Sequence, residues 1–152
     1  MQVTRAVDYG IRALVLMGRK PVGERFLLQD LARDGDLPRN YLVKVLKSLS
    51  TAGIVHSHRG IKGGFTLGKP PREIQLRAVV ESIDGPVSII HCLTDPGSCS
   101  KVKQCGVEAF FKQLREIVLV HLEKHTLQDL LDMQDKIDSG ADTKDVCLTP
   151  TA

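Results

Sequence analysis

Three cysteines lie close together in the second half of the 152-residue chain. Cys92, Cys99 and Cys105 fall within fourteen residues, on a segment rich in Gly, Pro, Asp and Ser that can fold back on itself. Thiolates are the ligands that zinc and iron-sulfur clusters prefer, so the spacing predicts a bound inorganic centre. Apolar packing is the alternative role of a cysteine, but a polar loop does not favour it. The fourth cysteine, Cys147, lies near the C-terminus, and we predict no role for it.

The composition is that of one soluble domain. A hydrophobic content of 42% suffices for a single core, and the absence of tryptophan argues against a stacking platform for single strands. We find neither a signal peptide nor a run of about 18 apolar residues, so we expect a cytoplasmic protein without a membrane span. Disulfides are rare in the cytoplasm, which again favours metal, cluster or redox chemistry for the cysteines.

Charge is unevenly distributed along the chain. Residues 1–72 carry 13 Lys/Arg and 5 Asp/Glu, a net charge of +8, whereas residues 73–152 carry 8 and 13, a net charge of −5. The basic half is therefore a candidate binder of a polyanion. Basic residues scattered over a solvated surface are the alternative explanation.

The basic half contains the pattern of a helix-turn-helix. Apolar residues at helical spacing predict helices over about 4–19, 27–33 and 38–52, with a turn at 34–36 between the last two. The outward face of the third helix carries side chains that donate to phosphates and base edges, although a plain solvated face is the alternative. From these two segments we predict DNA contacts by Gln29, Arg39, Asn40, Tyr41, Lys44, Lys47 and Ser48.

Two strand-like segments, 54–58 and 65–67, flank a glycine-rich basic tip. This pattern is typical of a wing, because glycine lets the backbone approach the minor groove while Arg59 and Lys62 enter its negative potential. A nucleotide-binding phosphate loop is not expected, since the glycines lack its spacing and its following helix. The predicted fold class is therefore mainly α with a small β wing, a winged helix-turn-helix.

The second half of the chain holds the cysteine loop between two predicted helices. A short helix precedes the loop, and the longest periodic segment, up to about residue 125, follows it with a wide apolar stripe. We predict that this stripe pairs two subunits, since palindromic operators need two-fold symmetry; packing on its own domain is the alternative. Thr126 with Asp129 predicts the start of a last helix. The predicted organisation is a DNA-binding region 1–72, a linking helix and cysteine loop 73–105, dimerisation and C-terminal helices 106–133, and a flexible tail 134–152.

Several segments together resemble the Rrf-type winged-helix transcription regulators. The resemblance runs from Met1 to about Met133 and rests on residues 3–14, 42–49, 52–55, 59–65 and 81–86 and on the three-cysteine loop. It implies a homodimeric regulator of a double-stranded DNA operator, not an enzyme. It further implies that an iron-sulfur cluster sensing redox state, nitric oxide or iron switches operator affinity, with the three loop cysteines as iron ligands.

The resemblance leaves the fourth cluster ligand open. One branch of the family places a histidine three residues after the third cysteine, where this chain has Glu108. Another branch has an aspartate in the first helix that reaches the cluster from the other subunit, and Asp8 matches that position. Asp8, His91, Glu108 and solvent therefore stand as candidates, and the cluster is 2Fe-2S or 4Fe-4S.

Two other roles of the loop are compatible with its residues. Structural zinc, or thiol sensing without a cluster, is the alternative for a regulator. A Cys-His hydrolase is not expected, because sequence neighbours such as His91 and Cys92 rarely have the required geometry.

Overall fold

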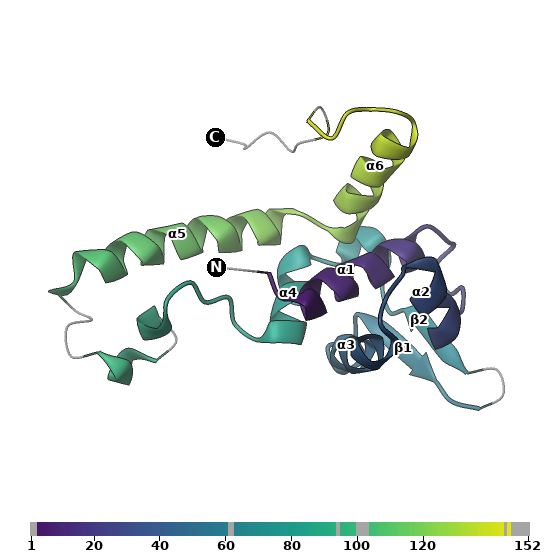
Figure 1. Ribbon diagram of the computed structural model, residues 1–152, viewed down its shortest axis with the longest axis horizontal. Helices are drawn as coiled ribbons and strands as arrows, with labels where there is room; N and C mark the ends of the chain where they lie inside the picture. Colours follow the sequence, from purple (N-terminus) through teal and green to yellow (C-terminus); the bar gives the residue numbers. More distant parts are fainter. Residues whose placement is uncertain (1–2, 61–62, 94, 100–103, 145, 147–152) are drawn as a thin grey trace.

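The computed structural model describes residues 3–60, 63–93, 95–99, 104–144 and 146. Its main elements are α1 (Arg5–Gly18), α2 (Leu28–Asp34), α3 (Arg39–Thr51), β1 (Val55–His58), β2 (Gly64–Leu67), α4 (Leu76–Asp84), α5 (Gly106–Lys124) and α6 (Leu127–Asp138). Three short 3₁₀ turns, η1 (Pro71–Glu73), η2 (His91–Leu93) and η3 (Pro96–Ser98), connect them. Figure 1 shows α1 to α4, the two strands and α6 gathered in one body, from which α5 projects. The fold is mainly helical with a two-stranded antiparallel sheet, as the sequence predicts.

The core lies where the helices of the body meet the sheet. Side chains from six elements, at most 1% exposed, form its centre: Leu14, Leu31, Leu46, Val55, Val79 and Leu127. Their helical and strand spacing puts them on one face of each element, and burying them supplies the main driving force for folding. Gly10 lets α1 approach α3 and α4, because a Cβ there would lie 3.0 Å from Val45 Cγ1 and 2.5 Å from Ile83 Cδ1.

Hydrogen-bonding caps fix the ends of two helices. The Thr4 hydroxyl accepts the Val7 N–H at 3.3 Å at the start of α1, and it donates to Asp84 at the end of α4 at 2.9 Å. At the start of α6, the Asp129 carboxylate accepts the Thr126 N–H at 2.7 Å, which confirms the predicted helix start. The Thr126 N–H holds the pKa of Asp129 below its ordinary value, because it favours the carboxylate form.

Helix α6 is longer than the sequence analysis predicts. It continues past residue 133 to Asp138, so the predicted boundary of the flexible tail at residue 134 lies inside the helix. The extra turn is held by Asp138, which accepts a hydrogen bond from Gln134 at 2.9 Å and pairs with Arg19 of α1. Beyond the helix, Val146 is 7% exposed. The interaction with α1 is long-range, which is why helical spacing alone did not indicate it.

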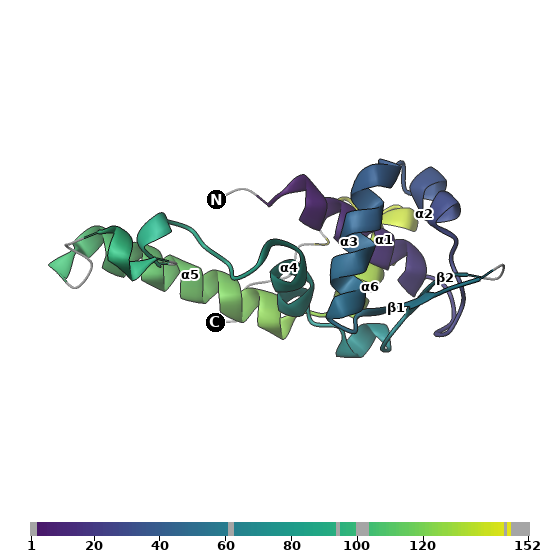
Figure 2. The same cartoon turned by 90° about the horizontal axis from the view of Figure 1, so that it is seen from below.

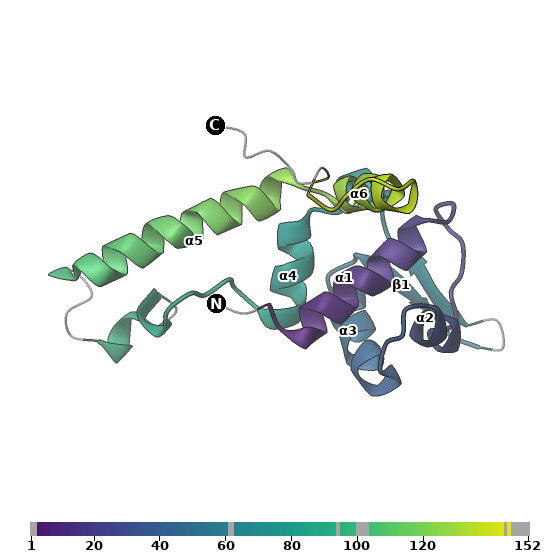
Figure 3. The ribbon, with the colours of Figure 1, turned by 45° about the horizontal axis from the view of Figure 1, so that its top comes forward.

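Helix α5 is attached to the body at its C-terminal end. The Leu76 N–H donates to His125 O at 2.9 Å and the Leu127 N–H donates to Ile74 O at 2.8 Å, so the α5–α6 junction is joined to the start of α4. Arg77 of α4 adds an ion pair with Glu123 at 2.9 Å. Figures 1 and 3 show the N-terminal end of α5 extending away from the body, with the cysteine loop beside it. Among the described residues, none of the helices has the length and apolar character needed to cross a membrane.

Candidate DNA-binding face and cysteine loop

Helices α2 and α3 form the helix-turn-helix. The turn between them includes Asp36 in the left-handed region (φ 50°), and Leu37 anchors it, being 5% exposed and donating its N–H to Ala32 O at 2.9 Å. The inward face of α3 is buried in the core and carries Leu42, Val45, Leu46 and Leu49. This leaves the opposite face of α3 free for a ligand.

The predicted DNA-contacting residues lie at the surface of the two helices. Arg39, Asn40, Lys44 and Lys47 are exposed on α3, and Gln29 is exposed on the second residue of α2. Tyr41 is 52% exposed, but its ring makes an edge contact with Tyr9 of α1 at 5.9 Å between ring centres. Ser48 is half-buried. The structure therefore places the ring of Tyr41 against α1, with Lys44 three residues further along the helix.

The wing is fixed to the segment that precedes α2. Strands β1 and β2 pair from Val55↔Leu67 to His58↔Gly64, and Phe26 and Phe65 exchange two backbone hydrogen bonds of 2.9 Å. Gly64 is required at this junction, because its φ is +138° and a Cβ would lie 2.6 Å from Phe26 O. Arg59 is exposed at the end of β1, and Lys62 lies outside the described residues.

Two hollows lie between the helix-turn-helix and the wing, and Figure 2 shows α3 next to the start of β1. One, of about 280 Å³, is lined by residues that include Gln29, Arg39, Gly60 and Phe65. The other, of about 330 Å³, is lined by Val43, Lys47, Ser50, Thr51, Ser57 and Phe65. The structure thus brings together Gln29 of α2, Arg39 of α3 and the wing. The sequence analysis did not single out Val43, although an apolar residue outside the inward stripe of α3 was a usable signal.

The three cysteines occupy the segment between α4 and α5. Cys92 lies in η2, Cys99 follows η3, and Cys105 immediately precedes α5, at the helix end whose dipole favours negative groups. All three are free thiols; Cys99 is exposed, and Cys92 and Cys105 are half-buried. Over the part of the chain that the structure describes, His, Cys, Asp and Glu side chains form no group of three that could hold a metal ion. The donor chemistry fits an iron or zinc centre, and the loop would have to close to use all three thiols.

The other candidate ligands lie on three different elements of the fold. His91 is next to Cys92 in η2, and its side chain is 78% exposed. Glu108 is half-buried in the first turn of α5. Asp8 lies on α1 and pairs with Arg12 at 2.9 Å. Figures 1 to 3 show the described part of the cysteine loop beside the end of α5 that lies away from the body, whereas α1, which carries Asp8, belongs to the body.

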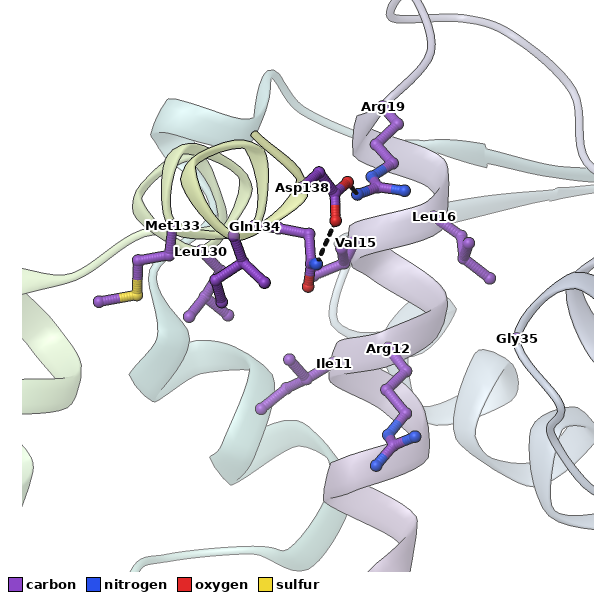
Figure 4. Close-up of a pocket in the computed structure, with 11 residues that line it drawn as sticks. Ile11, Arg12, Val15, Leu16, Arg19, Gly35, Leu130, Met133, Gln134 and Asp138 are labelled. Atoms are coloured by element: carbon purple, nitrogen blue, oxygen red, sulfur yellow. Dashed lines mark hydrogen bonds and ion pairs between the residues drawn. The ribbon is translucent and has the colours of Figure 1, made fainter. Parts of the chain in front are cut away.

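A third hollow, of about 500 Å³, lies between α1 and α6 (Figure 4). Its walls are largely apolar, and the Arg19–Asp138 pair closes one end. Hydrogen bonding from Gln134 and the charge of Arg19 hold the pKa of Asp138 below its ordinary value. The described residues that line this hollow include none of the predicted site residues, so we interpret it as a gap in the packing between α6 and α1.

Comparison with known proteins identifies related sequences and folds. Residues 3–133 match the family model Rrf2, described as "Iron-dependent Transcriptional regulator". The structure of CymR (YrzC), the global cysteine regulator of B. subtilis, is similar with a TM-score of 0.68 and 26% identity, over 87% of this chain and 97% of that one. T. potens IscR has a TM-score of 0.65 at 22% identity, over 93% of each chain. A transcriptional regulator from Listeria innocua has a TM-score of 0.72 at 23% identity, over 100% of this chain and 94% of that one.

Proposed function

The chain belongs to the Rrf2 family of transcriptional regulators, which are DNA-binding proteins rather than enzymes, and from this premise we propose that it is a homodimeric operator-binding protein controlled by its cysteine loop. The observation that supports DNA binding most is the exposed basic face of α3 beside the wing. In this proposal residues 1–72 form the DNA-binding region, 73–105 the linking segment and cysteine loop, and 106–133 the dimerisation region.

Binding to DNA would use the two sides of the hollows between α3 and the wing. Helix α3 enters the major groove, where Arg39 and Asn40 in its first turn face base edges. Lys44 and Lys47 neutralise phosphates further along the helix, and Gln29, Tyr41 and Ser48 add contacts from the flanks. The wing places Arg59 and Lys62 at the adjacent minor groove.

Dimerisation would use the apolar stripe of α5. Val107, Phe110 and Ile117 are 61%, 63% and 66% exposed in the single chain. Several exposed apolar side chains on one projecting helix are typical of a protein interface. A two-fold arrangement would present two α3 helices to two half-sites of a palindrome.

Control of DNA binding would begin at the three thiols. Cys92, Cys99 and Cys105 would hold an iron-sulfur cluster of the 2Fe-2S or 4Fe-4S type, which would supply sensitivity to oxidants, nitric oxide or iron supply. The segment before the loop is tied to α5, because Arg115 Nε donates to Val87 O at 2.7 Å. Ordering of the loop therefore acts on α5, and through its attachment to α4 on the body that carries α3.

A fourth ligand from a second chain would join the loop to the dimer. Asp8 is 44% exposed on its side chain and faces solvent near the start of α1. Acting as a ligand would break its exposed pair with Arg12, which contributes little to stability. We therefore place Asp8 of the second chain first among the candidates, ahead of His91, Glu108 and solvent.

The first experiment is spectroscopic. Protein purified without oxygen is examined by visible absorption and Mössbauer spectroscopy, with iron and sulfide counted, for the native chain, Asp8→Ala and the control Asp135→Ala, an exposed carboxylate of α6. A brown protein with matching iron and sulfide, altered by Asp8→Ala alone, supports the cluster and its fourth ligand. A colourless protein with one zinc per chain would replace the cluster by structural zinc.

Thiol sensing without a cluster is a second candidate, favoured by one observation. Cys99 is exposed and Cys92 and Cys105 are half-buried free thiols, so a soluble oxidant can reach the loop directly. Metal-free protein whose operator affinity changes on reversible oxidation, and no longer does so in Cys99→Ser, would favour this candidate over the cluster.

The second experiment tests DNA binding independently of the loop. A preferred duplex is selected from random-sequence DNA, and its affinity is measured against salt concentration for the native chain, Lys44→Ala and the control Lys124→Ala at the end of α5. Loss of one phosphate contact per chain lowers the slope of log affinity against log salt by about one for each half-site. Lys44→Ala and Lys124→Ala giving the same slope would contradict the placement of α3 on DNA.

A further inference from the structure

Val43 is an exposed apolar side chain in the middle of the basic face of α3. It is 48% exposed, although valine is a residue that usually contributes to the core. The inward stripe of α3 is already complete with Leu42, Val45, Leu46 and Leu49, each at most 2% exposed. The fold therefore does not need an apolar side chain at position 43.

The neighbours of Val43 are the residues proposed to contact DNA. Arg39 precedes it by four residues and Lys47 follows it by four, so the three side chains form one strip along the helix surface. Val43 and Lys47 also line the hollow of about 330 Å³ that faces the wing, together with Ser57 and Phe65. An apolar group between two cations on a ligand-binding strip indicates an apolar feature on the ligand.

DNA offers one apolar group in its major groove, the C5-methyl of thymine. We propose that Val43 contacts this methyl group and so selects an A·T pair at the base position facing the middle of α3. The inference rests on the proposed function, in which α3 enters the major groove. It adds a residue that determines sequence preference through shape and water exclusion, where Arg39 and Asn40 act through hydrogen bonds.

The test removes the thymine methyl group from the DNA and shortens the Val43 side chain in the protein. In the duplex selected from random-sequence DNA by the native chain, each thymidine is replaced in turn by deoxyuridine, which lacks only that methyl. Affinities are measured for the native chain, Val43→Ala and the control Val22→Ala, a 58% exposed valine in the segment between α1 and α2. Val43→Ala folds normally because the side chain it shortens is outside the core, and circular dichroism checks this.

The native chain should lose about fourfold in affinity at one thymidine of each half-site, the effect of one apolar carbon returned to water. Val43→Ala should bind the thymidine and deoxyuridine duplexes equally, and Val22→Ala should discriminate as the native chain does. Discrimination that persists in Val43→Ala, or its absence from the native chain at every position, overturns the proposal. A loss by the same factor on both duplexes in Val43→Ala is one form of persisting discrimination, because the preference for the thymidine duplex is then unchanged.

These outcomes are distinct from a failure of the proposed function. If no sequence is enriched from random DNA and no duplex binds, the assignment of α3 to DNA fails. If a duplex is selected and bound but the methyl has no effect, the inference about Val43 alone fails.

Discussion

Shortening Ile117 on α5 should weaken the dimer without harming the single chain. Ile117 is 66% exposed, and complete burial of such a side chain contributes about 1.5 to 3 kcal/mol. Burying the exposed two thirds therefore contributes about 1 to 2 kcal/mol per chain, or about 2 to 4 kcal/mol in a two-fold dimer. Ile117→Ala should raise the dimer dissociation constant by about 30-fold to 1000-fold.

Sedimentation equilibrium over a range of protein concentrations measures this constant. The matched control is Val22→Ala, which shortens a side chain of similar exposure away from α5. Alanine favours helix more than isoleucine, so Ile117→Ala should leave the helical circular dichroism unchanged. Equal dissociation constants for Ile117→Ala and Val22→Ala would refute the assignment of the stripe to dimerisation.

Three further predictions concern the body of the protein. Gly64→Ala should lower the free energy of unfolding by about 1 to 3 kcal/mol in urea titrations, since the new Cβ meets Phe26 O at a φ of +138°. The control Gly106→Ala should leave the free energy of unfolding unchanged, because nothing lies within 4 Å of the new Cβ. Equal stabilities of the two variants would contradict the described contact between the wing and Phe26. Asp129→Ala should cost about 1 kcal/mol at pH 7 through loss of the capping box. The pKa of Asp129 is lower in the folded chain than in the unfolded chain. The contribution of the Asp129 carboxylate to stability is therefore complete above the unfolded-state pKa near 4 and is lost as pH falls through the lower folded-state pKa. Urea titrations should show the stabilities of the native chain and Asp129→Ala converging in acid. On selected and random duplexes, Lys47→Ala should weaken binding to both, whereas Arg39→Ala should change the preferred sequence; equal losses on both duplexes for Arg39→Ala would remove it from base recognition.

The local elements could be predicted because their signals are local. Apolar spacing located α1, α2 and α3, and Thr126 with Asp129 located the start of α6. The glycine-rich tip between two short apolar segments located the wing. In each of these cases the pattern that locates the element lies within a few residues, so it can be recognised in the sequence.

The features that escaped prediction depend on distant contacts. The Asp138–Arg19 pair at the last turn of α6 joins residues 119 positions apart in the sequence. The contact of Tyr41 with Tyr9 of α1 joins residues 32 positions apart in the sequence. The role of Gly64 depends on Phe26, which pairs with the neighbouring Phe65. The ligand set of the cysteine loop belongs to the same class, since it depends on how the loop closes and on a second chain.

The attachment of α5 at one end makes it a lever arm. Its 19 residues span about 28 Å, so a shift of about 5 Å at the cysteine end corresponds to a rotation of about 10° at the hinge beside α4. The two backbone hydrogen bonds and the Arg77–Glu123 pair lie at this end of α5, where Leu119 is also buried. Under the control by the three thiols proposed above, a rearrangement of the loop would become a rotation of the body that carries α3, and the length of α5 would set the ratio between the two movements.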